Sequence, residues 1–245
     1  MRRVLAELGR GLSDVVFPPM CVHCRGLVPS ETEFRALCPR CEPQISRVTP
    51  PHCSTCGHPF YGEVEGERLC PHCEGLAPAY REGRTAVLLK GAGRSLVHEL
   101  KYHRGVHVLA DIETIFRQTP HVLELVRGAW LVPVPLHPRK KRERGYNQSE
   151  LIAECLARAA GGETRVAHLL VRELDTVSQT KHDRKTRQAN LRNAFALAKG
   201  ASITAERHLV LVDDVFTTGS TLNSCALTLR RAGALNLDVV TFGHG

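Results

Sequence analysis

The chain has 245 residues, of which 42% are hydrophobic and 24% charged, enough apolar material for one substantial core and a small satellite module. Its formal net charge of +8 favours ligands that carry phosphate, including nucleic acids, although aromatic residues make up only 5% and leave few platforms for base stacking. No apolar stretch is long enough to cross a bilayer, which excludes an integral membrane protein.

Residues 1–19 are expected to form an amphipathic helix. Apolar residues recur at helical spacing, at Val4, Leu5, Leu8, Leu12 and Val15. Glu7 and Asp14 interrupt them, so the segment contains neither a signal-peptide core nor a membrane span. We therefore expect a short helix packed on the protein and, together with the thiol-rich segment that follows, a cytoplasmic location.

Residues 20–76 carry a duplicated cysteine pattern. The four CxxC pairs are Cys21/Cys24, Cys38/Cys41, Cys53/Cys56 and Cys70/Cys73. Adding 32 to each of the first four positions gives the second four, which indicates an internal duplication. Two such pairs about a dozen residues apart can hold a tetrahedral zinc ion, and the ion stabilises a segment too short to form its own core. We expect tandem zinc ribbons with about two structural zinc ions.

Other interpretations of the cysteines stay open at this point. Disulfides or redox-active CxxC motifs are disfavoured, because neither a secretory signal nor a thioredoxin-like context is visible. Each zinc ion could lie within one repeat. It could instead lie between the repeats, with Cys21/Cys24 sharing an ion with Cys53/Cys56, since spacing alone does not exclude this arrangement.

Residues 84–245 alternate strand and helix patterns. The expected strands are Thr85–Leu89, Ala129–Val134, Val166–Leu170, Leu209–Val212 and Leu237–Phe242. The expected helices are Ser95–Tyr102, Ile112–Gln118, Gln148–Ala160 and Leu222–Ala232. This alternation predicts an α/β fold with an open, mainly parallel sheet and helices on both faces. Residues 75–84 are the expected joint to the cysteine-rich module, because glycine and proline interrupt the periodicity there.

Two polar segments are candidates for binding a charged ligand. Residues 139–144 carry five cations, Arg139, Lys140, Lys141, Arg142 and Arg144, and lead into Arg-Gly-Tyr-Asn-Gln at 144–148. The segment could be a solvated basic loop, but its place after a strand favours pyrophosphate binding. Residues 179–195 are also polar and basic, as expected of a mobile loop that closes over a charged ligand or of an ordinary exposed connection.

Residues 209–222 are the most informative segment. The β-branched run Leu209–Val212 predicts a central parallel strand, and ligands of open α/β sheets bind beyond the carboxyl ends of such strands. Asp213 and Asp214 follow it. Next comes a hydroxyl-rich loop that opens a helix, with Thr217, Thr218, Gly219, Ser220 and Thr221. A solvated strand end and a helix cap would account for the same residues. The compound pattern instead favours a phosphorylated ribose, whose phosphate would lie at the helix N-terminus where Gly219 lets the backbone come close.

This segment resembles the phosphoribosyl pyrophosphate (PRPP) signature of type I phosphoribosyltransferases. With the CxxC repeats and the segments 144–148 and 179–195, nearly the whole chain resembles the ComF family of competence and phosphoribosyltransferase-like proteins. The resemblance implies that Asp213 and Asp214 hold the ribose hydroxyls and that residues 217–221 hold the 5′-phosphate. It also implies PRPP contacts from Arg144, Gly145, Asn147, Gln148, Gln179 and Arg187. It further implies a link to the uptake of transforming DNA.

The chemistry implied by the resemblance is displacement of pyrophosphate from C1 of PRPP through an oxocarbenium-like transition state. A Mg²⁺ ion bridging pyrophosphate and ribose oxygens, together with Arg144, would stabilise the leaving group. The acceptor is not named by the resemblance. The alternative function is a non-catalytic protein that binds single-stranded DNA through its basic surface, with PRPP as a regulatory ligand.

Overall fold

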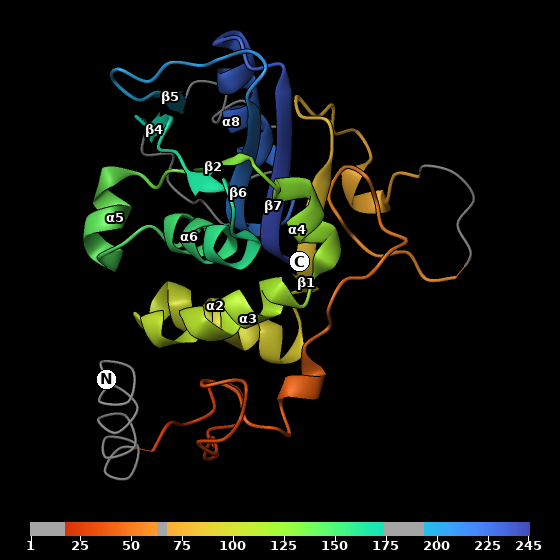
Figure 1. Cartoon of the computed structure of the whole chain (residues 1–245), viewed down its shortest axis with the longest axis vertical. Coiled ribbons are helices and arrows are strands. Elements are labelled where there is room, and N and C mark those ends of the chain that lie inside the picture. The colour runs from red at the N-terminus through yellow and green to blue at the C-terminus, as the bar shows by residue number, and fades with distance from the viewer. Residues whose placement is uncertain (1–17, 63–67, 174–193) are drawn as a thin grey trace.

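The computed structural model describes residues 18–62, 68–173 and 194–245, and their centre is a five-stranded sheet (Figure 1). Its order is β1-β7-β6-β2-β3, and all neighbouring strands are parallel. The strands are β1 (Gly83–Leu88), β2 (Trp130–Pro133), β3 (Arg165–Val166), β6 (His208–Phe216) and β7 (Asn236–His244). A second sheet is an antiparallel pair, β4 (Leu170–Arg172) and β5 (Phe195–Leu197).

Helices cover both faces of the sheet, as the sequence predicts. The α-helices are α2 (Gly91–Tyr102), α3 (Leu109–Arg117), α4 (Pro120–Val126), α5 (Pro138–Arg144), α6 (Gln148–Ala160) and α8 (Ser220–Arg231). Short 3₁₀ helices are η1 (Glu42–Gln44), η2 (Pro71–Cys73) and η3 (Val106–Val108). Side chains of β6 alternate between the faces: Val210 and Val212 pack toward α2, α3, α4 and α6, whereas Leu209 and Leu211 pack toward α8. The central strand is therefore buried on both sides.

Three local predictions were wrong. The strand expected over Val166–Leu170 is divided, because β3 ends at Val166 and β4 begins at Leu170 in the other sheet. The basic segment is the helix α5 rather than a loop: Pro138 occupies its first turn, and Gly145 ends it in a left-handed conformation. The strand expected to end at Val212 continues to Phe216, because its backbone stays paired with β7.

The zinc-ribbon segment is not a satellite, since each cysteine set shares a buried cluster with one face of the sheet domain. The first set packs with α2 and α3, and the second packs with the face covered by α8. The carboxylate of buried Asp111 on α3 accepts hydrogen bonds from the backbone N–H groups of Arg35 (2.7 Å) and Ala36 (2.9 Å). The domain bounds at residues 20–76 and 84–245 stay a prediction.

The segment between the two cysteine sets runs along the outer edge of β1. Val48 donates a hydrogen bond to the carbonyl of Ala86 (2.9 Å), and Leu88 donates one to Ser46 (2.8 Å). Gly83, at the start of the strand, donates to Ser54 (2.6 Å). The backbone groups of β1 that face away from β7 therefore have partners within the chain.

The expected N-terminal helix lies outside the described residues, except for its last two positions, and so do Gln179 and Arg187. Among the described helices, none has the length and hydropathy needed to cross a membrane.

Candidate ligand site and metal centres

The acidic pair lies in the last part of β6, beside the amino end of α6 and the carboxyl end of α2. Asp213 accepts hydrogen bonds from the Ser149 hydroxyl (2.8 Å) and from the backbone N–H of Asp214 (2.9 Å). Asp214 Oδ1 forms an ion pair with Lys101 Nζ (2.8 Å). The other oxygen of Asp214, Oδ2, is buried and has no hydrogen-bond partner among the described residues. A buried acceptor of this kind is costly unless a ligand donates to it.

The burial of Asp213 and its closeness to Asp214 shift its pKa. Burial raises the pKa of Asp213 to about 7, and the adjacent negative charge of Asp214 acts in the same direction. The Ser149 hydrogen bond and the positive charge of Lys101 offset only part of this effect. Below that pH Asp213 takes up a proton and becomes a weaker acceptor for ligand hydroxyls.

Residues 144–149 connect the basic helix α5 to the acidic pair. Asn147 caps α6: its side chain accepts a hydrogen bond from the Ser149 N–H (3.2 Å) and donates one to the Val134 carbonyl (2.9 Å). The Arg144 guanidinium donates to the side-chain oxygen of Gln148, which is buried. In this structure, therefore, Asn147 fixes the start of α6 and directs Ser149 toward Asp213. Contacts of Arg144, Gly145, Asn147 and Gln148 with PRPP stay a prediction.

The hydroxyl loop opens α8, as expected. The Thr218 and Ser220 hydroxyls are 3.0 Å apart, Thr217 is exposed, and Thr221 lies in the first turn of the helix. The N-terminal amides of α8 therefore lie beside hydroxyl donors, an arrangement suited to an anion. Contacts of residues 217–221 with a phosphate stay a prediction.

Gly219 has a packing role that the sequence did not predict. It is left-handed (φ 69°), and a Cβ built on it would lie 2.7 Å from the ring of Phe216 and 3.0 Å from Leu76. The glycine is required by packing within the protein, in addition to any approach of a ligand.

Sequence reasoning missed Lys101 and Ser149. Lys101 ends an amphipathic helix and resembles an ordinary solvent-facing lysine, and Ser149 follows the segment that drew attention. Only the tertiary structure brings α2 and α6 to the end of β6.

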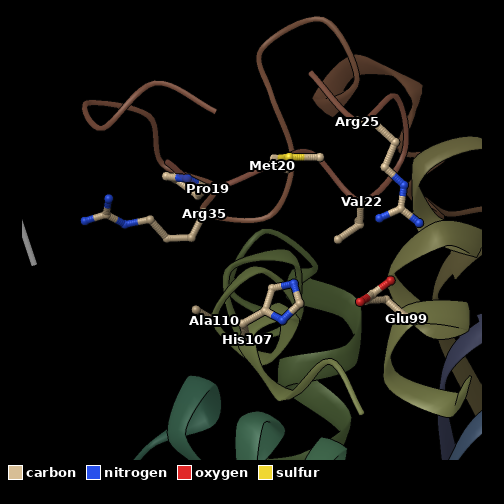
Figure 2. A pocket seen from close by; sticks show the side chains of 8 residues that line it. All are labelled: Pro19, Met20, Val22, Arg25, Arg35, Glu99, His107 and Ala110. Atoms are coloured by element: carbon tan, nitrogen blue, oxygen red, sulfur yellow. The ribbon is translucent and has the colours of Figure 1, made fainter. Parts of the chain in front are cut away.

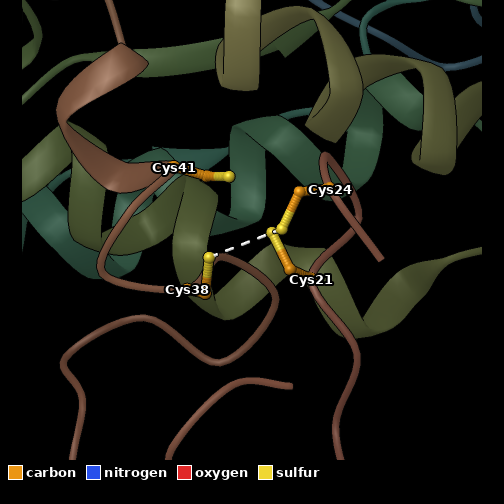
Figure 3. A group of neighbouring side chains, drawn as sticks. All are labelled: Cys21, Cys24, Cys38 and Cys41. Carbon is orange, nitrogen blue, oxygen red and sulfur yellow. Dashed lines mark hydrogen bonds between the residues drawn. The ribbon is translucent and has the colours of Figure 1, made fainter. Parts of the chain in front are cut away.

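The eight repeat cysteines form two groups of four, each within one repeat (Figure 3 shows the first). In each group the four sulfur atoms lie within 4.8 Å of one another. Measured pairs are Cys24–Cys38 at 3.6 Å, Cys56–Cys70 at 3.4 Å and Cys70–Cys73 at 3.8 Å. Four thiolates at Zn–S distances of about 2.3 Å form a tetrahedron with edges of about 3.8 Å, so both groups fit zinc. The interleaved pairing is excluded, and the expected structural zinc sites are supported.

The duplication extends to the backbone. Arg25 and Gly57, which are 32 positions apart, are both left-handed, with φ of 63° and 76°. Each donates its N–H to the first cysteine of its repeat at 2.8 Å. The next residue in each repeat, Gly26 or His58, donates to the second cysteine's sulfur at 3.4 Å. Two copies of one metal-binding turn are therefore present.

The two metal centres differ in exposure, which predicts different zinc lability. Cys24 in the first group is exposed, whereas all four cysteines of the second group are buried. We expect about two zinc ions per chain, and a chelator under native conditions should remove one much faster than the other. A colorimetric zinc indicator follows the release over time. Release of both ions at one rate, with the fold intact, would contradict this expectation.

A cavity of about 710 Å³ is lined by residues of the first zinc ribbon and of the neighbouring helices (Figure 2). Met20 lies across it, and Arg25 and Glu99 point toward each other from opposite sides. None of its lining residues is a candidate site residue.

Comparisons with known proteins agree with this architecture. A family described as double zinc ribbon domain matches residues 12–74. Competence protein F of Haemophilus influenzae is 37% identical over 119 residues, covering 49% of this chain and 51% of that protein. DNA utilization protein YhgH of Salmonella typhimurium is 34% identical over 148 residues, covering 59% and 63%. Competence protein ComFC of Bacillus subtilis is 25% identical over 153 residues, covering 62% and 60%. Over these segments the chain is similar to competence proteins F and ComFC and to DNA utilization protein YhgH.

The matched part of the chain spans between half and two thirds of the length of these relatives. Among solved structures, a hypoxanthine phosphoribosyltransferase of Staphylococcus aureus aligns with a TM-score of 0.35 and 18% identity, covering 54% of this chain and 62% of that one. A likeness this low carries no conclusion about function.

Proposed function

We propose that this protein binds PRPP with Mg²⁺ at the carboxyl end of β6 and transfers its phosphoribosyl group to an acceptor. The observation that carries the proposal is Oδ2 of Asp214, which is buried and has no hydrogen-bond partner in the described part of the chain, beside Asp213 and shortly before the hydroxyl loop of α8. A ribose diol would donate to the two carboxylates while its 5′-phosphate lies at the amides of α8. The motif resemblance supports the same assignment.

The chain's own residues would act by position and charge. Asp213 and Asp214 orient the ribose and favour positive charge that develops at C1. Arg144 and the other cations of α5 would neutralise charge on the leaving pyrophosphate. When bound, Mg²⁺ supplies further neutralisation of the pyrophosphate oxygens. The names of the relatives, which refer to competence and DNA utilization, support a role in the handling of DNA.

Replacing Asp214 with Asn tests this proposal. The amide presents an N–H₂ group or a neutral oxygen where the ribose hydroxyl needs a charged acceptor. PRPP binding should weaken by about 1.5–3 kcal/mol, or roughly 10- to 100-fold. Calorimetric titration with PRPP and Mg²⁺ measures this loss. Glu206→Gln is the matched control, because this exposed carboxylate precedes β6 at its other end.

Wild-type protein that does not bind PRPP, or an Asp214→Asn variant that binds it normally, would remove the proposal. Catalysis is tested separately, by release of pyrophosphate that depends on an added acceptor. PRPP binding without any such release would favour a regulatory role for the ligand.

The second candidate function, binding of single-stranded DNA, is supported by α5. Arg142 on this helix is exposed and Lys140 is half-buried, and neither forms an ion pair with the described residues, whereas Lys141 is paired with Glu150 (3.2 Å). If both free cations contact phosphates, replacing them with Ala should reduce the slope of log affinity against log salt by about 1.4. Fluorescence anisotropy with a labelled oligonucleotide at several salt concentrations gives this slope. An unchanged slope would exclude α5 from the DNA interface.

A further inference from the structure

Lys101 lies in the last turn of α2, and its ammonium group is 2.8 Å from Asp214 Oδ1. Both side chains are shielded, with 21% of Lys101 and 7% of Asp214 exposed. The titratable group next to this pair is Asp213, which is ionised above pH 7, and the other side chain bound to the carboxylates, Ser149, is neutral. Within the described residues, the two adjacent carboxylates are thus paired with one cation, Lys101.

Two contacts hold the helix α2, which carries Lys101, in place. The Tyr146 hydroxyl donates a hydrogen bond to the carbonyl of Leu100, whose side chain is fully buried. One and a half turns earlier, Ser95 on α2 hydrogen-bonds to His23 of the first zinc ribbon (2.9 Å). The helix is therefore fixed to both the segment 144–149 and the zinc ribbon, and the lysine reaches the acidic pair from a fixed position.

We propose that Lys101 is the resident counterion of the Asp213–Asp214 pair and makes it a clamp for a vicinal diol, not a binding site for a divalent metal. The identity of the diol as a ribose of PRPP rests on the proposed function. The prediction that the pair binds no divalent metal ion is independent of the proposed function. In this arrangement the metal reaches the site only on the oxygens of the ligand.

The argument compares how many carboxylate oxygens an ammonium group and a divalent metal ion would each occupy at the acidic pair. Two buried carboxylates without a counterion carry two negative charges at close range, which is costly and attracts a hard divalent cation. An ammonium group at Asp214 Oδ1 removes one of these charges. It leaves Oδ2 of the same carboxylate without a partner, and this oxygen accepts a ligand hydroxyl. A divalent ion held by the two carboxylates would instead occupy this oxygen itself, and the carboxylate would no longer accept the ligand hydroxyl directly.

Lys101→Met removes the charge but retains the length of the side chain. With Mn²⁺ as the probe and no PRPP, the zinc-loaded full chain is titrated, and free Mn²⁺ is followed by electron paramagnetic resonance. Wild type should bind no Mn²⁺ at the pair, whereas Lys101→Met should bind one ion, at least about tenfold more tightly than any Mn²⁺ binding by wild type. Lys101→Arg should restore exclusion, because the guanidinium keeps the charge.

Two further variants identify the location of the new site. Lys199→Met removes an exposed lysine that has no partner among the described residues, and it should behave as wild type. Adding Asp214→Asn to Lys101→Met should abolish the gained Mn²⁺ binding. If Lys101→Met does not fold, as judged by circular dichroism, Lys101→Gln is titrated in its place with the same expectation.

Equal Mn²⁺ binding by wild type and Lys101→Met would overturn the proposal, whether both bind the ion or neither does. Binding that survives Asp214→Asn would also overturn it, because the ion would then lie elsewhere. PRPP titration of wild type is scored separately. A failure to bind PRPP together with the gain of Mn²⁺ binding would reject the proposed function and retain Lys101 as the counterion.

Discussion

Cys38→Ser is expected to destabilise the whole protein in one cooperative transition, and not only the first zinc ribbon. Loss of a thiolate ligand removes the stabilisation that zinc gives to residues 21–41. Cys38 belongs to the same buried cluster as Leu96 on α2 and Phe116 on α3. When the ribbon opens, Asp111 loses the two N–H donors that satisfy its buried carboxylate. We expect a loss of about 3 kcal/mol or more, and a fall of the melting temperature by roughly 6–12 °C.

Cys155→Ser is the matched control, since Cys155 is equally buried but is not a metal ligand. It should cost about 1 kcal/mol and leave the zinc content at two. Circular dichroism and elemental analysis on the same samples give both quantities. A Cys38→Ser protein that holds one zinc ion and melts at the wild-type temperature would show that the ribbon folds independently, as the sequence pattern alone suggested.

Gly219→Ala is expected to lower the stability by about 2–5 kcal/mol. An L-residue at φ 69° costs about 1–2 kcal/mol. The new Cβ would also lie 2.7 Å from Phe216, whose ring is buried and stacks on His244, so the ring cannot move aside freely. Overpacking of this kind adds roughly 1–3 kcal/mol.

Gly128→Ala separates the two contributions to this loss. Gly128 has almost the same backbone angle (φ 70°), but nothing lies within 4 Å of its Cβ position. It should therefore cost only the backbone strain. Urea denaturation of both variants measures the difference. Equal losses would mean that Phe216 and Leu76 repack without cost.

The sequence predicted the elements whose signals are local. The apolar run at Leu209–Val212 is long enough to specify a buried strand, and Gln148–Ala160 was predicted with its observed ends because Asn147 caps the helix and Gly161 follows it. The CxxC spacing identified all eight metal ligands. It left the pairing open, because both pairings satisfy the same intervals.

What the sequence missed depends on contacts between distant segments. Lys101 and Ser149 meet the acidic pair only because α2 and α6 both end at the carboxyl edge of the sheet, and neither residue has an unusual local context. The extent of β6 beyond Val212 is set by pairing with β7, which overrides the low strand preference of two aspartates. The helix α5 escaped notice because its seven residues contain no buried side chain and hence no apolar periodicity.

The segment that follows the outer edge of β1 also bears on solubility and assembly. A bare edge strand is a template on which another chain can add its own strand, and this is a common route to aggregation. The two edge strands of the parallel sheet are β3, which is short, and β1. Residues 46–48 and 54 of the zinc-ribbon segment hydrogen-bond to the outer edge of β1 and so shield it. A variant that lacks the residues before Leu76 would expose this edge of β1. It would also expose the apolar surface that each cysteine set covers on the sheet domain. Such a variant should self-associate through β1, so shortened versions of this protein need a substitute for residues 46–48 and 54 along that edge.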